Sequence, residues 1–228
     1  MSAARRTSAL VAALVMASSV LAQDAPSAAD PVLIIALHPW GSRGRAMERV
    51  VAAAGLPCDH VVWAPDGSLP AGRGHAWLGH LVGDGAHRAA LGRDAARAAD
   101  TLVARLRARA PGQRAIVTGI SQGAVVAYAL AAAHPDAADA VVAASGLLPE
   151  GLPVHEGDVP IVAVHGERDA FVPFARLQAG LTRLRAAGRR VELHRFPRAG
   201  HRVRGPLRAA HQDALRAAAC PEATRGEP

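Results

Sequence analysis

Lysine is absent from the sequence, and aromatic residues are scarce. All 26 basic residues are arginines, and Phe, Trp and Tyr together make up only 3% of the 228 residues, so a core must be built mainly from Ala, Val, Leu and Ile. No aromatic residues are interleaved with the arginines, as a protein that stacks single-stranded bases would require, and no zinc-finger spacing or basic heptad repeat is present. These absences argue against a nucleic-acid-binding protein.

The excess of positive charge has two interpretations. The formal net charge is +7, and clusters such as Arg105, Arg107 and Arg109 could bind phosphate or an acidic surface. The favoured interpretation is a set of solvated helix faces, because alanine and arginine fill most helical positions, as is typical of a GC-rich genome. A hydrophobic content of 50% excludes a disordered chain, and this length suits a single α/β domain.

Residues 1–22 have the three parts of a secretory signal peptide. Arg5 and Arg6 precede an apolar run that is closed by the small residue Ala22. The run is too short, and too soon followed by acidic residues and proline, to read well as a membrane span. We expect cleavage after Ala22, a short linker over residues 23–31, and a periplasmic or secreted protein. An uncleaved anchor is the alternative, and the paired arginines hint at twin-arginine export.

Only two cysteines are present, Cys58 and Cys220. Export would place them in an oxidising compartment, where a disulfide could tie the C-terminal helix to the first half of the fold. Two unpaired cysteines are an equally good interpretation. Neither residue has the CxxC spacing of a redox or metal site, and we expect no metal.

From Pro31 onward, apolar β-branched runs alternate with helical patterns. The expected strands are Val32–Leu37, His60–Trp63, Ala115–Thr118, Ala140–Ala144, Ile161–Val164 and Val191–Phe196. The expected helices are Ala46–Ala54, His87–Ala110, Gln122–Ala133, Phe174–Ala187 and Pro206–Ala219. This order predicts an α/β fold with one mostly parallel sheet of six or seven strands and helices on both faces. We expect a single domain over residues 32–220, with no large lid, and a flexible tail over residues 221–228.

Ser121 lies between two glycines, in Gly119-Ile120-Ser121-Gln122-Gly123, where an apolar strand meets a helix that we expect to be amphipathic. A nucleophile elbow turns so sharply that side chains two residues before and after the serine would collide with the neighbouring chain, which explains Gly119 and Gly123. The helix N-terminus would also stabilise developing negative charge. The motif therefore makes Ser121 a candidate nucleophile.

A serine nucleophile needs a base, and the base needs a carboxylate to orient it. Asp169 lies beyond the end of one later strand and His201 beyond the end of the last, in the order acid then histidine that this kind of sheet requires. We expect Ser121, Asp169 and His201 to act together. The rival bases, which we expect to serve packing or the surface, are His134, His165 and His194. The alternative acids are Glu167, which is nearer the strand, and Asp158, which precedes it.

An oxyanion hole would complete the site. One backbone N–H should come from Gln122, directly after the candidate nucleophile. The other should come from the loop His38-Pro39-Trp40-Gly41-Ser42 after the first strand; Pro39 has no N–H, so Trp40 is the expected donor. A plain tight turn is the alternative for this loop.

Six segments in this order resemble the small carboxylesterases and acyl-protein thioesterases of the α/β-hydrolase superfamily. They are LHPWGS, WAPDGSLPAGRGHAW, GISQGA, ASGLLP, HGERDAFVP and AGH, and the similarity runs from about Val32 to Leu215. The resemblance implies a Ser121–Asp169–His201 triad and an oxyanion hole formed by the amides of Trp40 and Gln122. The chain departs from the family at Pro39, where glycine is usual, and in its export signal.

The expected function is hydrolysis of carboxylic esters or thioesters of small or medium acyl groups. We expect a small-molecule substrate, no cofactor, and a protein that is a monomer or homodimer. Trp77, Leu147 and Val172 are candidates for the acyl pocket, with the loop over residues 65–85 as its wall; a surface loop with one buried tryptophan is the alternative. A peptidase or polyester depolymerase with the same triad is the runner-up function. A non-catalytic periplasmic binding protein is the alternative from another class.

Overall fold

The computed structural model describes residues 30–80, 87–109 and 112–224. Six parallel strands form the main sheet in the order β2-β1-β5-β6-β7-β8. The strands are β1 (Val32–Leu37), β2 (His60–Trp63), β5 (Ala115–Ile120), β6 (Ala140–Ala144), β7 (Ile161–Gly166) and β8 (Val191–Phe196). The helices are α1 (Gly44–Ala54), α2 (Arg88–Arg107), α3 (Gln122–Ala133), α4 (Phe174–Ala186), α5 (Pro206–Ala219) and α6 (Pro221–Thr224). The α/β class and the parallel sheet predicted from the alternating pattern are confirmed.

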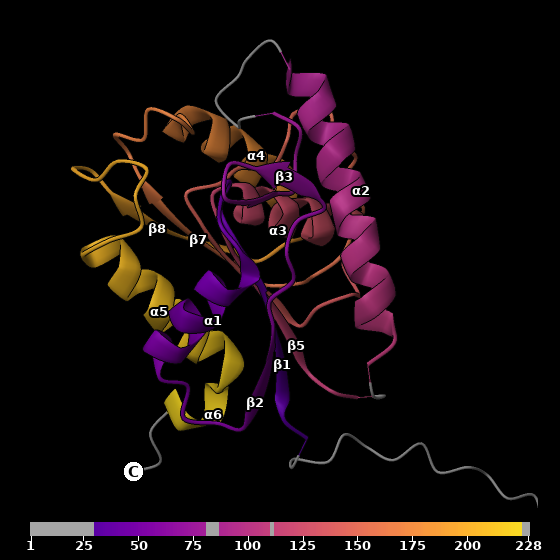
Figure 1. The fold of residues 1–228 in the computed structure, drawn as a ribbon, viewed down its shortest axis with the longest axis vertical. Helices are drawn as coiled ribbons and strands as arrows, with labels where there is room; N and C mark the ends of the chain where they lie inside the picture. Colours follow the sequence, from indigo (N-terminus) through magenta and orange to yellow (C-terminus); the bar gives the residue numbers. More distant parts are fainter. Residues whose placement is uncertain (1–29, 81–86, 110–111, 225–228) are drawn as a thin grey trace, which may run out of the picture.

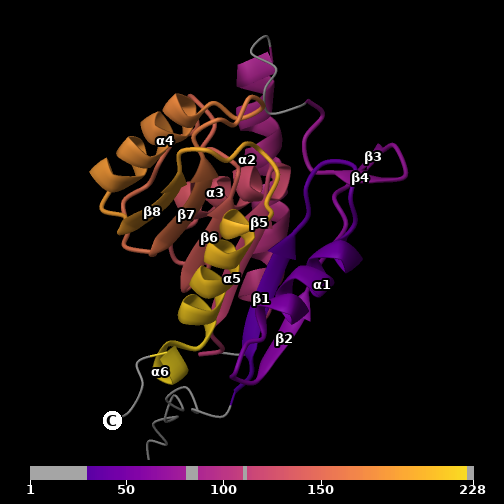
Figure 2. The same cartoon turned by 90° about the vertical axis from the view of Figure 1, so that its left-hand side faces the viewer.

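Helices cover both faces of the sheet. In Figure 2, α1 and α5 lie in front of the sheet and α2 and α3 lie behind it; α4, seen beside β8, packs into the same core as α2 and α3. The strands β1, β5 and β6 are buried on both sides and, apart from Gly119, consist of β-branched residues, alanine and leucine, as expected for central parallel strands. The larger apolar core lies between the sheet and α2, α3 and α4, and a second core lies under α1 and α5. Among the described residues, no helix is long and apolar enough to cross a membrane.

The strand order reverses between β1 and β5. From β1 the chain continues to β2 on one side, whereas from β5 it continues through β6, β7 and β8 on the other side (Figure 1). In an open parallel sheet, ligands bind beyond the carboxyl ends of the strands at such a reversal, because the two following loops separate and leave a crevice. Ser121 follows β5, and the loop of residues 38–43 follows β1, so both are at this place.

Three local features differ from the sequence-based expectation. The segment after β2 forms an antiparallel hairpin, β3 (Leu69–Ala71) and β4 (Gly74–Ala76), where a loop was expected. The helix α3 is buried on all sides rather than amphipathic, because α2 packs over its outer surface. The first four residues of the expected tail form the short helix α6. The expected signal peptide and nearly all of the expected linker lie outside the described residues.

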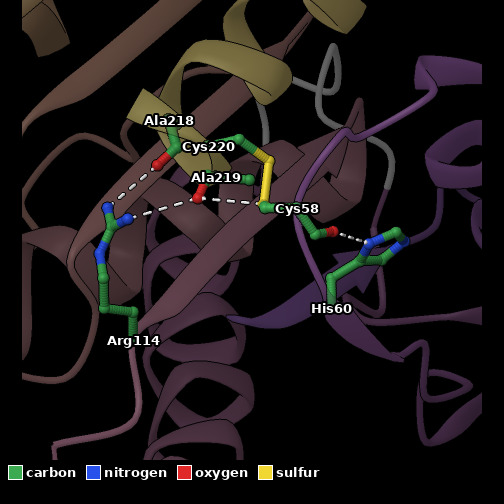
Figure 3. The surroundings of a disulfide bond; sticks show 6 residues. All are labelled: Cys58, His60, Arg114, Ala218, Ala219 and Cys220. Atoms are coloured by element: carbon green, nitrogen blue, oxygen red, sulfur yellow. Dashed lines mark hydrogen bonds between the residues drawn. A yellow bond between two sulfur atoms is a disulfide. The ribbon is translucent and has the colours of Figure 1, made fainter. Parts of the chain in front are cut away.

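A disulfide joins Cys58, in the chain before β2, to Cys220 at the end of α5. Figure 3 shows its surroundings: the Arg114 guanidinium donates hydrogen bonds to the carbonyl oxygens of Ala218 and Ala219, at 3.1 and 3.3 Å. These carbonyls at the end of a helix have no partners within the helix, and a cation there is favourable. The disulfide and Arg114 together fasten the end of α5 to the amino ends of the strands. Of the two interpretations of the cysteines, the disulfide is the correct one.

Candidate functional site

The turn after β5 forces Ser121 into a strained backbone conformation. Its φ is +56°, a region that residues with a side chain rarely adopt. A Cβ atom added at Gly119 would lie 2.4 Å from the carbonyl group of Gly123, and one added at Gly123 would lie 2.1 Å from the Leu37 carbonyl oxygen. Only glycine lets Gly119 lie this close to Gly123 and lets the start of α3 lie this close to β1. The spacing of the two glycines therefore has a steric cause.

The side chains of Ser121, His201 and Asp169 form a continuous hydrogen-bonded chain. The distance between Ser121 Oγ and His201 Nε2 is 2.9 Å, and His201 Nδ1 lies 2.8 Å from Asp169 Oδ2. Because the carboxylate can only accept, His201 carries its proton on Nδ1, and Nε2 is left to accept the serine proton. This arrangement can deprotonate a serine hydroxyl.

Asp169 is nearly inaccessible to solvent, yet its environment favours the charged form. Burial by itself raises its pKa, but hydrogen bonds from His201 and the Val172 amide outweigh that effect and lower the pKa. The amides of Phe171 and Val172 donate to the other carboxylate oxygen at 2.9 and 2.8 Å. The carboxylate is therefore ionised and held in one orientation.

The loops that carry Asp169 and His201 are joined to each other. The Arg168 amide donates to the Ala199 carbonyl oxygen at 2.9 Å. A Cβ atom added at Gly166 would lie only 2.3 Å from that same oxygen, so glycine at the end of β7 lets the two loops meet.

The rival candidates have other partners. His165 is buried beside Asp169; its Nε2 donates to the Val172 carbonyl oxygen at 2.9 Å, and burial lowers its pKa, so it is neutral. His194 pairs with Glu192 and His134 with Asp100, each at 2.7 Å, while Glu167 lies 3.6 Å from Arg195. The Arg189 guanidinium is the charged group that faces Asp158. Among the described residues, none of these histidines or acids is hydrogen-bonded to the Ser121 side chain, which pairs with His201.

Two backbone amides near Ser121 are candidates for an oxyanion hole. Gln122 is the first residue of α3, so its N–H has no acceptor within the helix. Trp40 lies in the turn after β1, and its amide has no hydrogen-bond partner among the described residues. The register places Leu37 opposite Gly119, so this turn and the elbow extend from neighbouring positions of the sheet.

The Gln122 side chain, which the sequence did not single out, joins the elbow to the chain after β4. Its oxygen accepts from the Trp77 amide at 3.1 Å, and its nitrogen donates to the carbonyls of Leu78 and His80 at 3.2 and 2.9 Å. The Trp77 ring nitrogen in turn donates to the His38 carbonyl oxygen at 2.9 Å. Gln122 is buried, so these bonds are shielded from water.

The expected pocket residues Trp77, Leu147 and Val172 are all buried. Trp77 packs against the His38 ring, with centroids 5.1 Å apart. Two large apolar side chains in the loops of the site face solvent: Trp40, 51% exposed, and Phe171, 61% exposed, whose ring lies 5.2 Å from that of His201. No cluster of three or more metal-ligating side chains occurs in the described part of the chain.

Comparison with known proteins gives a consistent result. A profile of the Phospholipase/Carboxylesterase family matches residues 19–207. The crystal structure of the esterase PE8 is 25% identical, with a TM-score of 0.70, and the match covers 84% of this chain and 94% of that one. A carboxylesterase from Mesorhizobium loti is 20% identical, with a TM-score of 0.59, over 81% of this chain and 88% of that one. The Bacillus cereus carboxylesterase is 17% identical, with a TM-score of 0.61, over 86% and 92%. No curated protein matches significantly.

Proposed function

Because the chain belongs to the phospholipase/carboxylesterase family of α/β-hydrolases and is a carboxylesterase-family hydrolase, we propose that it cleaves carboxylic esters or thioesters of small or medium acyl groups through an acyl-enzyme on Ser121. The observation that carries this proposal is the 2.9 Å approach of Ser121 Oγ to the unprotonated nitrogen of His201, on a strained elbow at the strand-order reversal. Asp169, His201 and the amides of Trp40 and Gln122 are proposed as the remaining catalytic groups.

The proposed reaction has two halves. His201 Nε2 takes the Ser121 proton as Oγ bonds to the acyl carbon, and the Trp40 and Gln122 amides stabilise the oxyanion. The tetrahedral intermediate then expels the alcohol or thiol, which receives the proton from His201. Water attacks the acyl-enzyme with His201 again as base. The bond from the acyl carbon to Ser121 Oγ then breaks, Oγ takes the proton back from His201, and the free acid leaves. Asp169 orients the imidazole and stabilises its charged form in both halves.

Active-site labelling tests this assignment. A fluorophosphonate probe reacts only with an activated serine, so the purified protein should be labelled and Ser121→Ala should not be. Equal labelling of both proteins, or of neither, would remove Ser121 as the nucleophile. A panel of nitrophenyl esters of increasing chain length, with thioester, peptide and polyester substrates, then separates the proposed activity from that of a peptidase or depolymerase.

We further propose that the protein is exported and works in the periplasm or outside the cell. The disulfide between Cys58 and Cys220 supports this, since such bonds persist in oxidising compartments. Sequencing the N-terminus of the protein recovered from the periplasm or medium should give Gln23 as the first residue. A product that begins at residue 1 and is recovered from the cytoplasm would contradict the proposal.

A further inference from the structure

Hydrogen bonds to its carbonyl oxygen fix the orientation of the peptide group between Pro39 and Trp40. The Pro39 carbonyl oxygen accepts hydrogen bonds from the Ser42 amide at 3.1 Å and from His38 Nδ1 at 2.8 Å. Gly41 has a φ of +72°, so residues 39–42 form a tight turn with glycine at the position that requires a positive φ. The Gly41 amide is itself bonded to the His75 carbonyl oxygen, so the Trp40 amide is the donor of the turn that has no partner within the part of the chain that the structure describes.

The hydrogen bonds of His38 determine its tautomer. The Gly67 amide donates to His38 Nε2 at 2.9 Å, so that nitrogen carries no proton. The ring is completely buried, and burial lowers its pKa, so it is neutral and its proton is on Nδ1. His38 therefore donates to the Pro39 carbonyl, and Gly67 fixes which ring nitrogen does so.

A peptide group is planar, and in the trans form its C=O and N–H point in opposite directions. No cis bond occurs among the described residues. Holding the Pro39 oxygen with two donors thus also fixes the direction of the Trp40 N–H. We propose that His38 is a positioning residue: its Nδ1–H orients the Pro39–Trp40 peptide so that the Trp40 amide is presented to the oxyanion. This inference rests on the proposed function.

The ring of His38 has a supporting framework that extends to the nucleophile elbow. Trp77 packs against the ring and donates to the His38 carbonyl oxygen, while its own amide donates to the Gln122 side chain. Pro39 adds rigidity because its φ is fixed. The two candidate oxyanion donors, Trp40 and Gln122, are thereby held relative to each other through Trp77 and His38.

Two substitutions separate the two hydrogen bonds of the ring. The amide nitrogen of asparagine takes the place of Nδ1, so His38→Asn keeps a donor for the Pro39 oxygen and loses the acceptor for Gly67. The amide oxygen of glutamine takes the place of Nε2, so His38→Gln keeps the acceptor and loses the donor. If His38 served only to anchor Gly67, the glutamine variant would be the better enzyme.

The experiment measures kcat and KM for a nitrophenyl ester, and the inhibition constant of a trifluoromethyl ketone, whose adduct with serine carries an oxyanion. We expect His38→Asn to stay within about threefold of the wild type, and His38→Gln to lose roughly 10- to 100-fold in kcat and in inhibitor affinity with little change in KM, because one oxyanion donor is worth about 10²–10³-fold in kcat. Equal values for the two variants, or a lower kcat for the asparagine variant, would overturn the proposal.

A second measurement uses the wild-type protein and does not depend on how well the variants fold. Nitrogen NMR of histidine-labelled protein should show His38 with a protonated Nδ1 and an unprotonated Nε2; the opposite tautomer would overturn the proposal. Failure of the proposed function would look different, since the wild type itself would then lack turnover that depends on Ser121.

Discussion

At the scale of single residues, the arrangement around Ser121 assigns proton transfer and the orientation of the imidazole to different side chains. The hydroxyl of Ser121 and the imidazole of His201 are proposed to exchange the proton, whereas Asp169 takes no proton and fixes the ring. Its ionised state is maintained despite burial by hydrogen bonds from His201 and from the amides of Phe171 and Val172. This division of roles predicts that replacing the carboxylate lowers kcat much more than it weakens substrate binding.

Asp169→Asn tests that division. The amide cannot stabilise the imidazolium, and it favours the wrong tautomer of His201, so kcat should fall by about 10³–10⁴-fold while KM changes by only a few-fold. Steady-state kinetics with a nitrophenyl ester measures both constants. A kcat within tenfold of the wild type would contradict the role given to Asp169.

His211 makes a separate prediction about stability. This histidine is buried in α5, where its Nε2 lies 2.9 Å from Thr118 Oγ1, and burial lowers its pKa to about 4 from 6.5. The unfolded chain binds the proton more readily, so stability is fully present above pH 6.5 and is lost as the pH falls towards 4. The wild type should therefore lose about 3 kcal/mol more than His211→Gln between pH 7 and pH 4. Urea unfolding at both pH values measures this difference, and parallel losses in the two proteins would refute it.

At the scale of elements, the positions of the six strands could be predicted from the sequence, although β5 and β7 each continue two residues beyond the expected ends at Thr118 and Val164. Apolar runs such as Val32–Leu37 and Ala140–Ala144 have the composition of central parallel strands, and they located the loops that carry the candidate site residues. The hairpin β3–β4 could not be predicted, because its residues include Pro70, Gly72 and Gly74 and lack β-branched side chains.

The surroundings of α3 show a second limit of sequence patterns. Its twelve residues are nearly all apolar, which is typical of a helix buried on every side. The prediction of an amphipathic helix was therefore wrong. The hydrogen bonds of the Gln122 and His38 side chains join residues 45 and 29 positions apart. No local pattern predicts such contacts, which depend on the assembled tertiary structure.

The close packing of α3 on β1 predicts a large effect of one methyl group. Gly123→Ala would bring Cβ to 2.1 Å from the Leu37 carbonyl oxygen, so the helix must move, at a cost of about 2–4 kcal/mol and with loss of turnover. Gly92→Ala in α2 is the matched control, because its nearest neighbour would be an ordinary contact at 3.6 Å, and it should stabilise the protein by about 0.5–1 kcal/mol. Denaturant unfolding of both variants decides; similar effects would contradict this account of the elbow.

At the scale of the whole molecule, the disulfide and the candidate active site lie at opposite ends of the strands. The candidate nucleophile and its partners follow the carboxyl ends of the strands, whereas Cys58 and Arg114 lie just before the first residues of β2 and β5, beside the end of α5 (Figure 3). The disulfide spans 162 positions and links most of the described chain into one loop. It should therefore control global stability with little influence on the reaction.

Reduction of Cys58–Cys220 should lower the free energy of unfolding by roughly 3–5 kcal/mol, because the unfolded chain regains the freedom of a long loop. Under conditions where the protein stays folded, kcat should change less than about twofold, since the site does not contact the disulfide. Unfolding curves and kinetics with and without reductant test this, with Cys58→Ser/Cys220→Ser as a control that reductant should not affect. A selective loss of kcat in folded, reduced protein would contradict the separation.

The most direct test of the central claim is to locate the acyl group during turnover. The protein is mixed with a nitrophenyl acetate, quenched in acid within the first turnovers, digested and examined by mass spectrometry. The account predicts one acetyl group on the peptide that contains Ser121, and none in Ser121→Ala. Ester hydrolysis without an acetylated Ser121, or with the acetyl group on another residue, would contradict it.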